Sequence, residues 1–546
     1  MSEETSPPDT QAHASLWWNA FVRGTADDFS AAVGAMDGRD AALADPAWFA
    51  TLARHRRLLG AAGLDLIARL DADEPGCVRS AEVLYLEALP RQADPALLRA
   101  INASSCAIER ATMGHRVRLD GREMAPHEVR GVLRAGRDTA RRAEVWESSR
   151  ALGPRIAGDF VGLVGLRNRA ARQVGFPDFR AMHLHLEELD ARRLAALFDD
   201  LDALTRGPYL AAKAGIDARL ARACGIGPGD LRPWHYHDEF AKRAPAADGV
   251  DLDAPYRGAD IPRLCGDFYA GIGLPLDDVL ARSDLHERPG KGPHAFCTDL
   301  DREGDIRVLA DIAADEASAG CLLHELGHAA YFKNIGRGLP RALRTHAHSL
   351  VSEGAALLFE RLSTDGGWLR AMGVRLDDPA AFAAAGARRR RDDLLFFARW
   401  SLVVFRFEAA MYADPGRDLD TLWWDLVEEY QGIRRPGGLH APDWACSYHI
   451  INRPCDYHNY MLGELLAAQL HRTIAREVLG GVEPSRANYA GRAEVGRFLV
   501  DRVFAPGNSL RWDALIRQAT GSDLAVDAFA AEIAIDMTAA GSQEPP

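Results

Sequence analysis

Apolar residues recur along most of this chain at intervals of three and four, the spacing that places them on one face of an α-helix. The clearest stretches predict helices at residues 17–33, 46–70, 95–113 and 156–173. Asp94 followed by Pro95 is typical of an N-cap and a first-turn proline. Gly175 and Pro177 predict the end of the fourth helix. We therefore expect a predominantly α-helical protein.

Two short regions interrupt the helical pattern. Asp120-Gly121 predicts a turn. Residues 293–300 and 306–309 predict two strands, and the polar residues 301–305 between them predict the turn of a β-hairpin. No internal repeat or low-complexity linker divides the chain. We expect one large helical domain over residues 14–537, between disordered tails at 1–13 and 538–546.

Composition narrows the classes of function. The chain has 546 residues, and its formal charge of −13 comes from 78 acidic and 65 basic residues. This balance disfavours nucleic acid as the main partner, because phosphate binding needs a basic surface. The eight cysteines are scattered without a Cys-x-x-Cys pair, so neither a disulfide framework nor a cysteine zinc site is indicated. The absence of an apolar signal core and of any apolar run of 18 residues favours a soluble cytoplasmic protein with no membrane partner.

The strongest chemical signal is His324-Glu325-Leu326-Gly327-His328. On a helix, positions i and i+4 share one face, so His324 and His328 can bind one metal ion, with Glu325 as a base for water held there. This donor set suits zinc, one ion per chain. Glu353 is the first candidate for a third ligand, ahead of His346 and His348. The polar stretch at residues 234–239, which contains two histidines, is a weaker alternative metal site.

A third cluster comes later in the chain. His449, Tyr457 and Tyr460 lie within a short segment, and the two tyrosines are three residues apart, which makes them neighbours on a helix face. Imidazole N–H and phenol O–H groups can stabilise the oxyanion that forms during peptide hydrolysis. Ordinary aromatic packing is the alternative interpretation of this cluster.

Taken together, these motifs resemble those of the angiotensin-converting-enzyme-like zinc peptidases and their bacterial oligopeptidase relatives. His294-Ala295 falls 30 positions before His324, where that family carries a substrate-binding strand. The segments that extend the resemblance are Phe268–Leu274, the Trp-Trp and Tyr-Gln-Gly pattern over residues 423–432, and the cluster from Tyr448 to Tyr460. The resemblance covers roughly residues 130–470 in the family's order.

The resemblance implies an all-helical, two-lobed metallopeptidase with a deep central channel and a small β-hairpin beside the active site. It implies that zinc is held by His324, His328 and Glu353, with Glu325 as the base. His449 and Tyr460 are then expected to stabilise the tetrahedral intermediate. Substrate binding is expected to involve His294, Ala295 and Tyr457. The implied activity is zinc-dependent hydrolysis of short peptides, of the peptidyl-dipeptidase or oligopeptidase type.

The chain departs from the family pattern at the substrate's C-terminal anchor and at the chloride sites. Ser447 stands where the converting enzyme carries a lysine for the substrate carboxylate, and Val427 stands in place of a chloride-binding arginine. These departures motivate two alternatives. One is a zinc enzyme acting on a specialised peptide or amide natural product, and the other is a non-catalytic peptide-binding relative.

Overall fold

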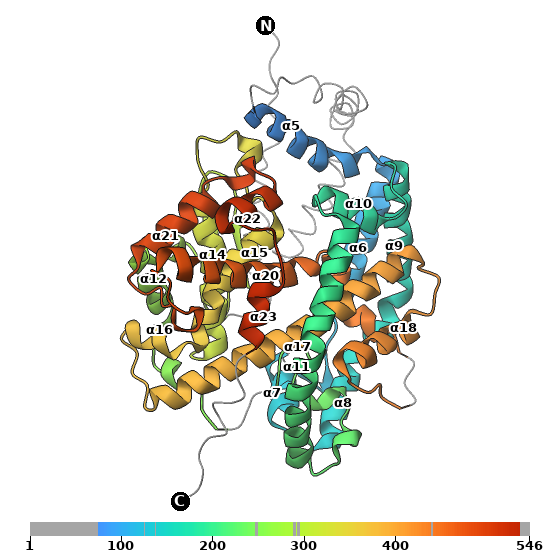
Figure 1. Cartoon of the computed structure of the whole chain (residues 1–546). Helices are drawn as coiled ribbons and strands as arrows, with labels where there is room; N and C mark the ends of the chain where they lie inside the picture. Colours follow the sequence, from blue (N-terminus) through green and yellow to red (C-terminus); the bar gives the residue numbers. More distant parts are fainter. Residues whose placement is uncertain are drawn as a thin grey trace, which may run out of the picture. The chain divides into compact units, whose positions relative to one another are not determined.

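The computed structural model describes residues 75–534, except 125, 137, 246–248, 288–290, 292–294 and 438–440. The helices expected at 17–33 and 46–70, both expected tails and His294 therefore lie outside the described residues. Over the rest, Figure 1 shows a chain built mostly of helices. The two short hairpins, β1–β2 and β3–β4, are antiparallel pairs. The prediction of a predominantly α-helical fold is confirmed.

The chain divides into two compact units, each assembled from separate segments. Among the described residues, the first unit comprises 75–89, Val250–Gly386 and Leu462–Leu524, and the second comprises Pro90–Gly249, Ala387–Met461 and residues 525–534. Two boundaries fall inside the helices α17 (Pro379–Ala413) and α20 (His458–Thr473). No linker sequence marks these boundaries.

The first unit contains the predicted metal motif. Its helices and strands are α5 (Pro75–Ala88), α12 (Ile261–Gly271), α13 (Asp277–Leu280), β3 (Phe296–Asp299), β4 (Ile306–Leu309), α14 (Glu316–Lys333), which carries the motif, α15 (Ser349–Glu360), α16 (Gly366–Ala371), α21 (Ala493–Leu499) and α22 (Trp512–Thr520). The second unit contains α6 (Pro95–Met113), β1 (Arg118–Leu119), β2 (Arg122–Glu123), α7 (Pro126–Ala135), α8 (Thr139–Arg150), α9 (Gly153–Gln173), α10 (Phe179–Leu186), α11 (Ala191–Cys224), α18 (Leu419–Leu426), α19 (Tyr448–Asn452) and α23 (Asp527–Ile533).

The predicted helix ends agree with the structure where both can be compared. The Asp94 side chain accepts a hydrogen bond from the Ala96 amide, so it caps α6, which begins at Pro95. Helix α9 ends at Gln173, and Gly175 follows with φ of +97°. A positive φ is readily adopted only by glycine, which explains why the helical path stops there.

Both hairpins follow from local turn chemistry. Asp120 and Gly121 have φ of +53° and +74°, as a two-residue turn between twisted strands requires. Their strands β1 and β2 are only two residues long each, too short for the sequence to show alternation. In the predicted hairpin, β3 pairs with β4 in register from Phe296 opposite Leu309 to Asp299 opposite Ile306. The prediction of a hairpin before the metal helix is confirmed.

The core of the first unit is the close crossing of α14 and α15. Leu322, Leu323 and Leu326 of α14 are fully buried. At Gly327, a side-chain Cβ would come within 2.7 Å of the Ala356 Cα on α15. Glycine therefore lets the two helix backbones approach more closely than any larger residue allows. The hairpin strands β3 and β4 also pack against α14.

Within the described residues, no helix combines the length and apolar character needed to cross a lipid bilayer.

Candidate metal centre

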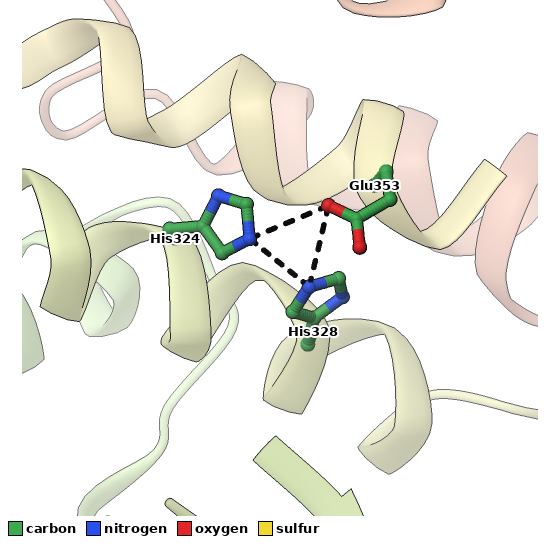
Figure 2. Close-up of side chains that lie close together, drawn as sticks. All are labelled: His324, His328 and Glu353. Atoms are coloured by element: carbon green, nitrogen blue, oxygen red, sulfur yellow. Dashed lines mark hydrogen bonds and ion pairs between the residues drawn. The ribbon is translucent and has the colours of Figure 1, made fainter. Parts of the chain in front are cut away.

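The two motif histidines converge on one point. Residues His324 and His328 stand one turn apart on α14, and their rings meet edge to face with centroids 4.8 Å apart. Their Nε2 atoms are 3.2 Å apart and point to the same side of the helix (Figure 2). The expected i, i+4 arrangement is therefore present, with the Nε2 atoms forming the shared face.

Glu353 reaches the same point from α15. Its Oε2 lies 3.5 Å from the His324 Nε2 and 3.9 Å from the His328 Nε2, completing the triangle drawn in Figure 2. The Glu353 backbone is held close by α20, where a Cβ at Gly463 would come within 2.7 Å of the Glu353 Cβ. Close packing of three helices thus positions this carboxylate.

The three ligand atoms fit a zinc ion. A tetrahedral zinc with ligands at about 2.0–2.1 Å has ligand-to-ligand edges of about 3.3–3.4 Å. The separations of 3.2, 3.5 and 3.9 Å in the structure bracket that value. All three side chains are partly exposed, which leaves the open side that a catalytic ion needs for water or substrate. Two neutral nitrogens and one carboxylate are also ligands that zinc accepts.

Two further side chains hold the histidine rings. His324 Nδ1 lies 2.9 Å from the Glu360 Oε2, and His328 Nδ1 lies 2.8 Å from the Ser352 Oγ. Because each Nδ1 makes this contact, each Nε2 faces the triangle. Hydrogen bonds to the second ring nitrogen commonly orient histidines that bind a metal. The sequence analysis missed Glu360 as an orienting group. The available signal was its position seven residues after Glu353, two turns along the same face of α15.

Two carboxylates, those of Glu353 and Glu360, set the protonation of His324. Burial lowers the pKa of this imidazole, but hydrogen bonds and charges from Glu353 and Glu360 outweigh burial and raise it well above its usual value. Without a metal, His324 is therefore an imidazolium whose Nδ1 proton faces Glu360 and whose Nε2 proton faces Glu353. Metal binding at Nε2 requires that this proton leave.

Glu325 lies in a less polar setting than the ligands. The residue is buried, and its Oε2 has no hydrogen-bond partner in the described part of the chain. Burial raises its pKa, His324 lowers it, and the charges of Glu353 and Glu360 raise it further, giving a value of about 7. A carboxyl with this pKa can both accept and release a proton near neutral pH.

The strand β3 lies near this carboxyl. Burial, and then the nearby charge of Glu325, raise the pKa of the Cys297 thiol in β3 well above its usual value. The half-buried Ala295 immediately precedes the strand, whereas its predicted partner His294 is outside the described residues. The predicted substrate strand therefore leads directly into β3.

The alternative metal ligands have other roles. The Nδ1 of His348 accepts a hydrogen bond from the Leu350 amide and caps α15, while His346 packs against the Phe332 ring. His235 accepts a bond from the Arg232 amide, and burial lowers its pKa to about 4. Among the described residues, the only group of three or more potential ligands with suitable spacing is His324, His328 and Glu353.

The later cluster is compact and belongs to the second unit. The His449 ring meets the Tyr457 and Tyr460 rings edge to face, with centroids 5.1 and 5.6 Å away. Tyr457 is buried, whereas His449 and Tyr460 are half-buried. The structure brings these three residues together, and their participation with the metal centre stays a prediction.

Comparisons with known proteins do not assign this chain to a family. No protein-family model matches this chain, and no curated protein sequence matches it significantly. The resemblance to the converting-enzyme-like peptidases therefore rests on the residues and motifs named above.

Proposed function

We propose that this protein is a zinc-dependent peptidase that hydrolyses peptide bonds in short peptides. The observation that carries the proposal is the arrangement of His324, His328 and Glu353 at tetrahedral spacing, with the buried carboxyl of Glu325 on the same helix. A purely structural histidine pair would not need three carboxylates around it. A bound divalent cation would balance the negative charge of these carboxylates and so stabilise the arrangement.

In the proposed reaction, a zinc ion held by His324, His328 and Glu353 would polarise the scissile carbonyl and acidify the attacking water. Glu325 accepts the proton of that water as its oxygen adds to the carbonyl carbon. Glu325 then donates the proton to the amide nitrogen and the C–N bond breaks. The remaining hydroxyl proton passes to the amine, so that a carboxylate and an ammonium group are released. His449 and Tyr460 are proposed to donate hydrogen bonds to the oxyanion, and Tyr457 to contact the substrate.

Substrate binding is proposed along β3. This strand has β4 as its neighbour within a sheet of two strands, so an extended peptide can align with the sheet by strand addition. The electrostatic coupling between Cys297 of β3 and Glu325 supports a substrate path close to the base. Such a path favours flexible peptides, because a folded chain does not offer an extended strand.

A second candidate is hydrolysis of an amide bond in a specialised peptide or natural product. Ser447 favours it, since this neutral residue is 1% exposed at the start of α19, where the peptidases that the sequence resembles carry a lysine for the substrate carboxylate. Equal cleavage of free and C-terminally amidated peptides would support an altered anchor. Strong preference for a free carboxylate would contradict it.

The test compares wild type, Glu325→Gln and the exposed control Glu147→Gln on an oligopeptide library, with fragments identified by mass spectrometry. We expect Glu325→Gln to retain one zinc per chain and lose turnover by at least about 100-fold, because it cannot accept the proton. Glu147→Gln should match wild type. Wild-type activity in Glu325→Gln, or a wild-type protein that binds zinc and cuts no peptide, would overturn the peptidase proposal.

A further inference from the structure

Beyond the metal centre, the segment that carries the predicted oxyanion donors has a strained backbone. Cys455 lies between α19 and α20 with φ of +58°, a left-handed conformation that favours glycine. The residue is 2% exposed, so solvent does not stabilise this conformation. His449 precedes it by six residues, and Tyr457 and Tyr460 follow it within five.

One buried carboxyl holds this strained residue. The Cys455 amide donates a hydrogen bond of 2.6 Å to the Glu408 Oε1, and Glu408, on α17, is itself only 3% exposed. The pKa of Glu408 is raised to about 8, and burial is the main cause. The charge of Asp456 also raises this pKa, whereas the hydrogen bond from the Cys455 amide and the charges of Arg180 and Arg167 lower it. With this raised pKa, the Glu408 carboxyl is mostly protonated at pH 7, and its Oε1 accepts the Cys455 amide in a buried setting.

The same segment is held at two other points. On one side, Arg167 of α9 donates from Nη2 to the Ile451 carbonyl at 3.2 Å. On the other, Asp456 accepts from the Arg453 Nε at 2.8 Å and from the Asn459 Nδ2 at 2.7 Å. Backbone hydrogen bonds from the Arg453 amide to the His449 carbonyl and from the Asp456 amide to the Arg453 carbonyl also hold the segment, and the bond to Glu408 holds the Cys455 amide itself.

We propose that Glu408 is a positioning residue for catalysis: by holding the left-handed Cys455 it sets where His449, Tyr457 and Tyr460 present their donors. The inference rests on the proposed function, because those donors matter only if the protein hydrolyses a substrate. Catalytic groups must be held to within a fraction of an ångström, and a displacement of about 1 Å costs about 100-fold in rate.

A cycle of variants separates this role from general stability. Glu408→Met keeps the length of the side chain and removes the strong acceptor, whereas Glu408→Gln keeps a neutral acceptor oxygen. Cys455→Gly removes the conformational strain, since glycine adopts a positive φ readily. The double variant Glu408→Met with Cys455→Gly asks whether relieving the strain replaces the missing bond.

The first measurement is hydrogen exchange of the peptide covering residues 450–457, which does not depend on activity. We expect exchange at least about tenfold faster in Glu408→Met and unchanged in Glu408→Gln, because a buried amide exchanges when its bond is lost. Equal protection in all variants would overturn the proposal.

The second measurement is kcat and KM on a peptide that wild type cleaves, with zinc content in parallel. We expect kcat to fall by about 100-fold in Glu408→Met, with zinc retained. Glu408→Gln should match wild type, and Cys455→Gly should restore most of the loss. Equal impairment of Gln and Met, or absence of rescue, would overturn the positioning role. If wild type cuts no peptide, the proposed function fails, while hydrogen exchange still decides whether Glu408 holds the segment.

Discussion

Replacing Gly327 by alanine should disturb the metal centre without touching a ligand. Gly327 lies on α14 directly before His328. A Cβ at this position would lie 2.7 Å from the Ala356 Cα and 3.3 Å from the Ala355 carbonyl oxygen. Both are backbone atoms in the middle of α15, so no side-chain rotation can relieve the contact.

The magnitude follows from two opposing effects. Alanine is favoured over glycine inside a helix by about 1 kcal/mol. Ordinary Cβ contacts begin at 3.4 Å, so the two helices must separate by roughly 0.7 Å, and overpacking of this kind costs about 1–3 kcal/mol. We therefore expect net destabilisation of the metal-free protein by about 1 kcal/mol. Metal ligands tolerate shifts of only about 0.2 Å, so zinc affinity should fall at least about tenfold.

The assay is thermal unfolding of the metal-free protein together with zinc titration against a competing chelator. Gly162→Ala is the matched control, because Gly162 is exposed on α9 and an added Cβ would meet nothing within 4 Å. That control should gain up to about 1 kcal/mol of stability and keep wild-type zinc affinity. If Gly327→Ala behaves like Gly162→Ala in both measurements, close helix packing does not position Glu353 and the reasoning is refuted.

Two further predictions concern the groups around the ligands. Glu360→Ala should weaken zinc binding by about 10–100-fold in the chelator assay, because the His324 ring loses the carboxylate that orients it, and wild-type affinity would contradict that role. Zinc binding near pH 7 should also release a proton from His324, whose raised pKa keeps it charged in the metal-free protein. Below that raised pKa the proton must leave before zinc binds, so affinity should fall as pH falls. Calorimetry in two buffers of different ionisation enthalpy measures the number of protons released. Glu325→Gln is the control, because it removes the Glu325 proton and retains the His324 proton. If neither protein releases a proton, His324 is not charged in the metal-free protein.

The sequence could predict what depends on local spacing. His324 and His328 are four residues apart, so their shared face follows from the period of one helix. The hairpin at β3 and β4 likewise follows from a turn between two strand-forming stretches. Glu353 was harder to distinguish from His346 and His348 as the third ligand. The loop between two helices has no repeating pattern that would show which of its neighbouring residues reaches the histidines. The structure shows that His348 caps α15 instead.

The boundaries of the two units could not be predicted from local sequence, for a physical reason. Two of its boundaries fall within α17 and α20, where the helical pattern continues without proline or a loop. Which face of a long helix packs against which neighbour depends on residues far away in the chain. Glu408 illustrates the same limit, because its partner Cys455 is 47 residues away and nothing local in α17 indicates a backbone acceptor.

The charges around His324 connect metal occupancy to the state of the proposed base. Glu325, Glu353 and Glu360 lie around His324, which is protonated in the metal-free protein, and burial together with the charges of Glu353 and Glu360 raises the pKa of Glu325 to about 7. A bound divalent cation reverses the local balance, because it favours the ionised form of every nearby acid. Glu325 would then be a carboxylate at neutral pH and could accept a proton from water. If the proposed function holds, bound zinc would thus control both the electrophile and the base.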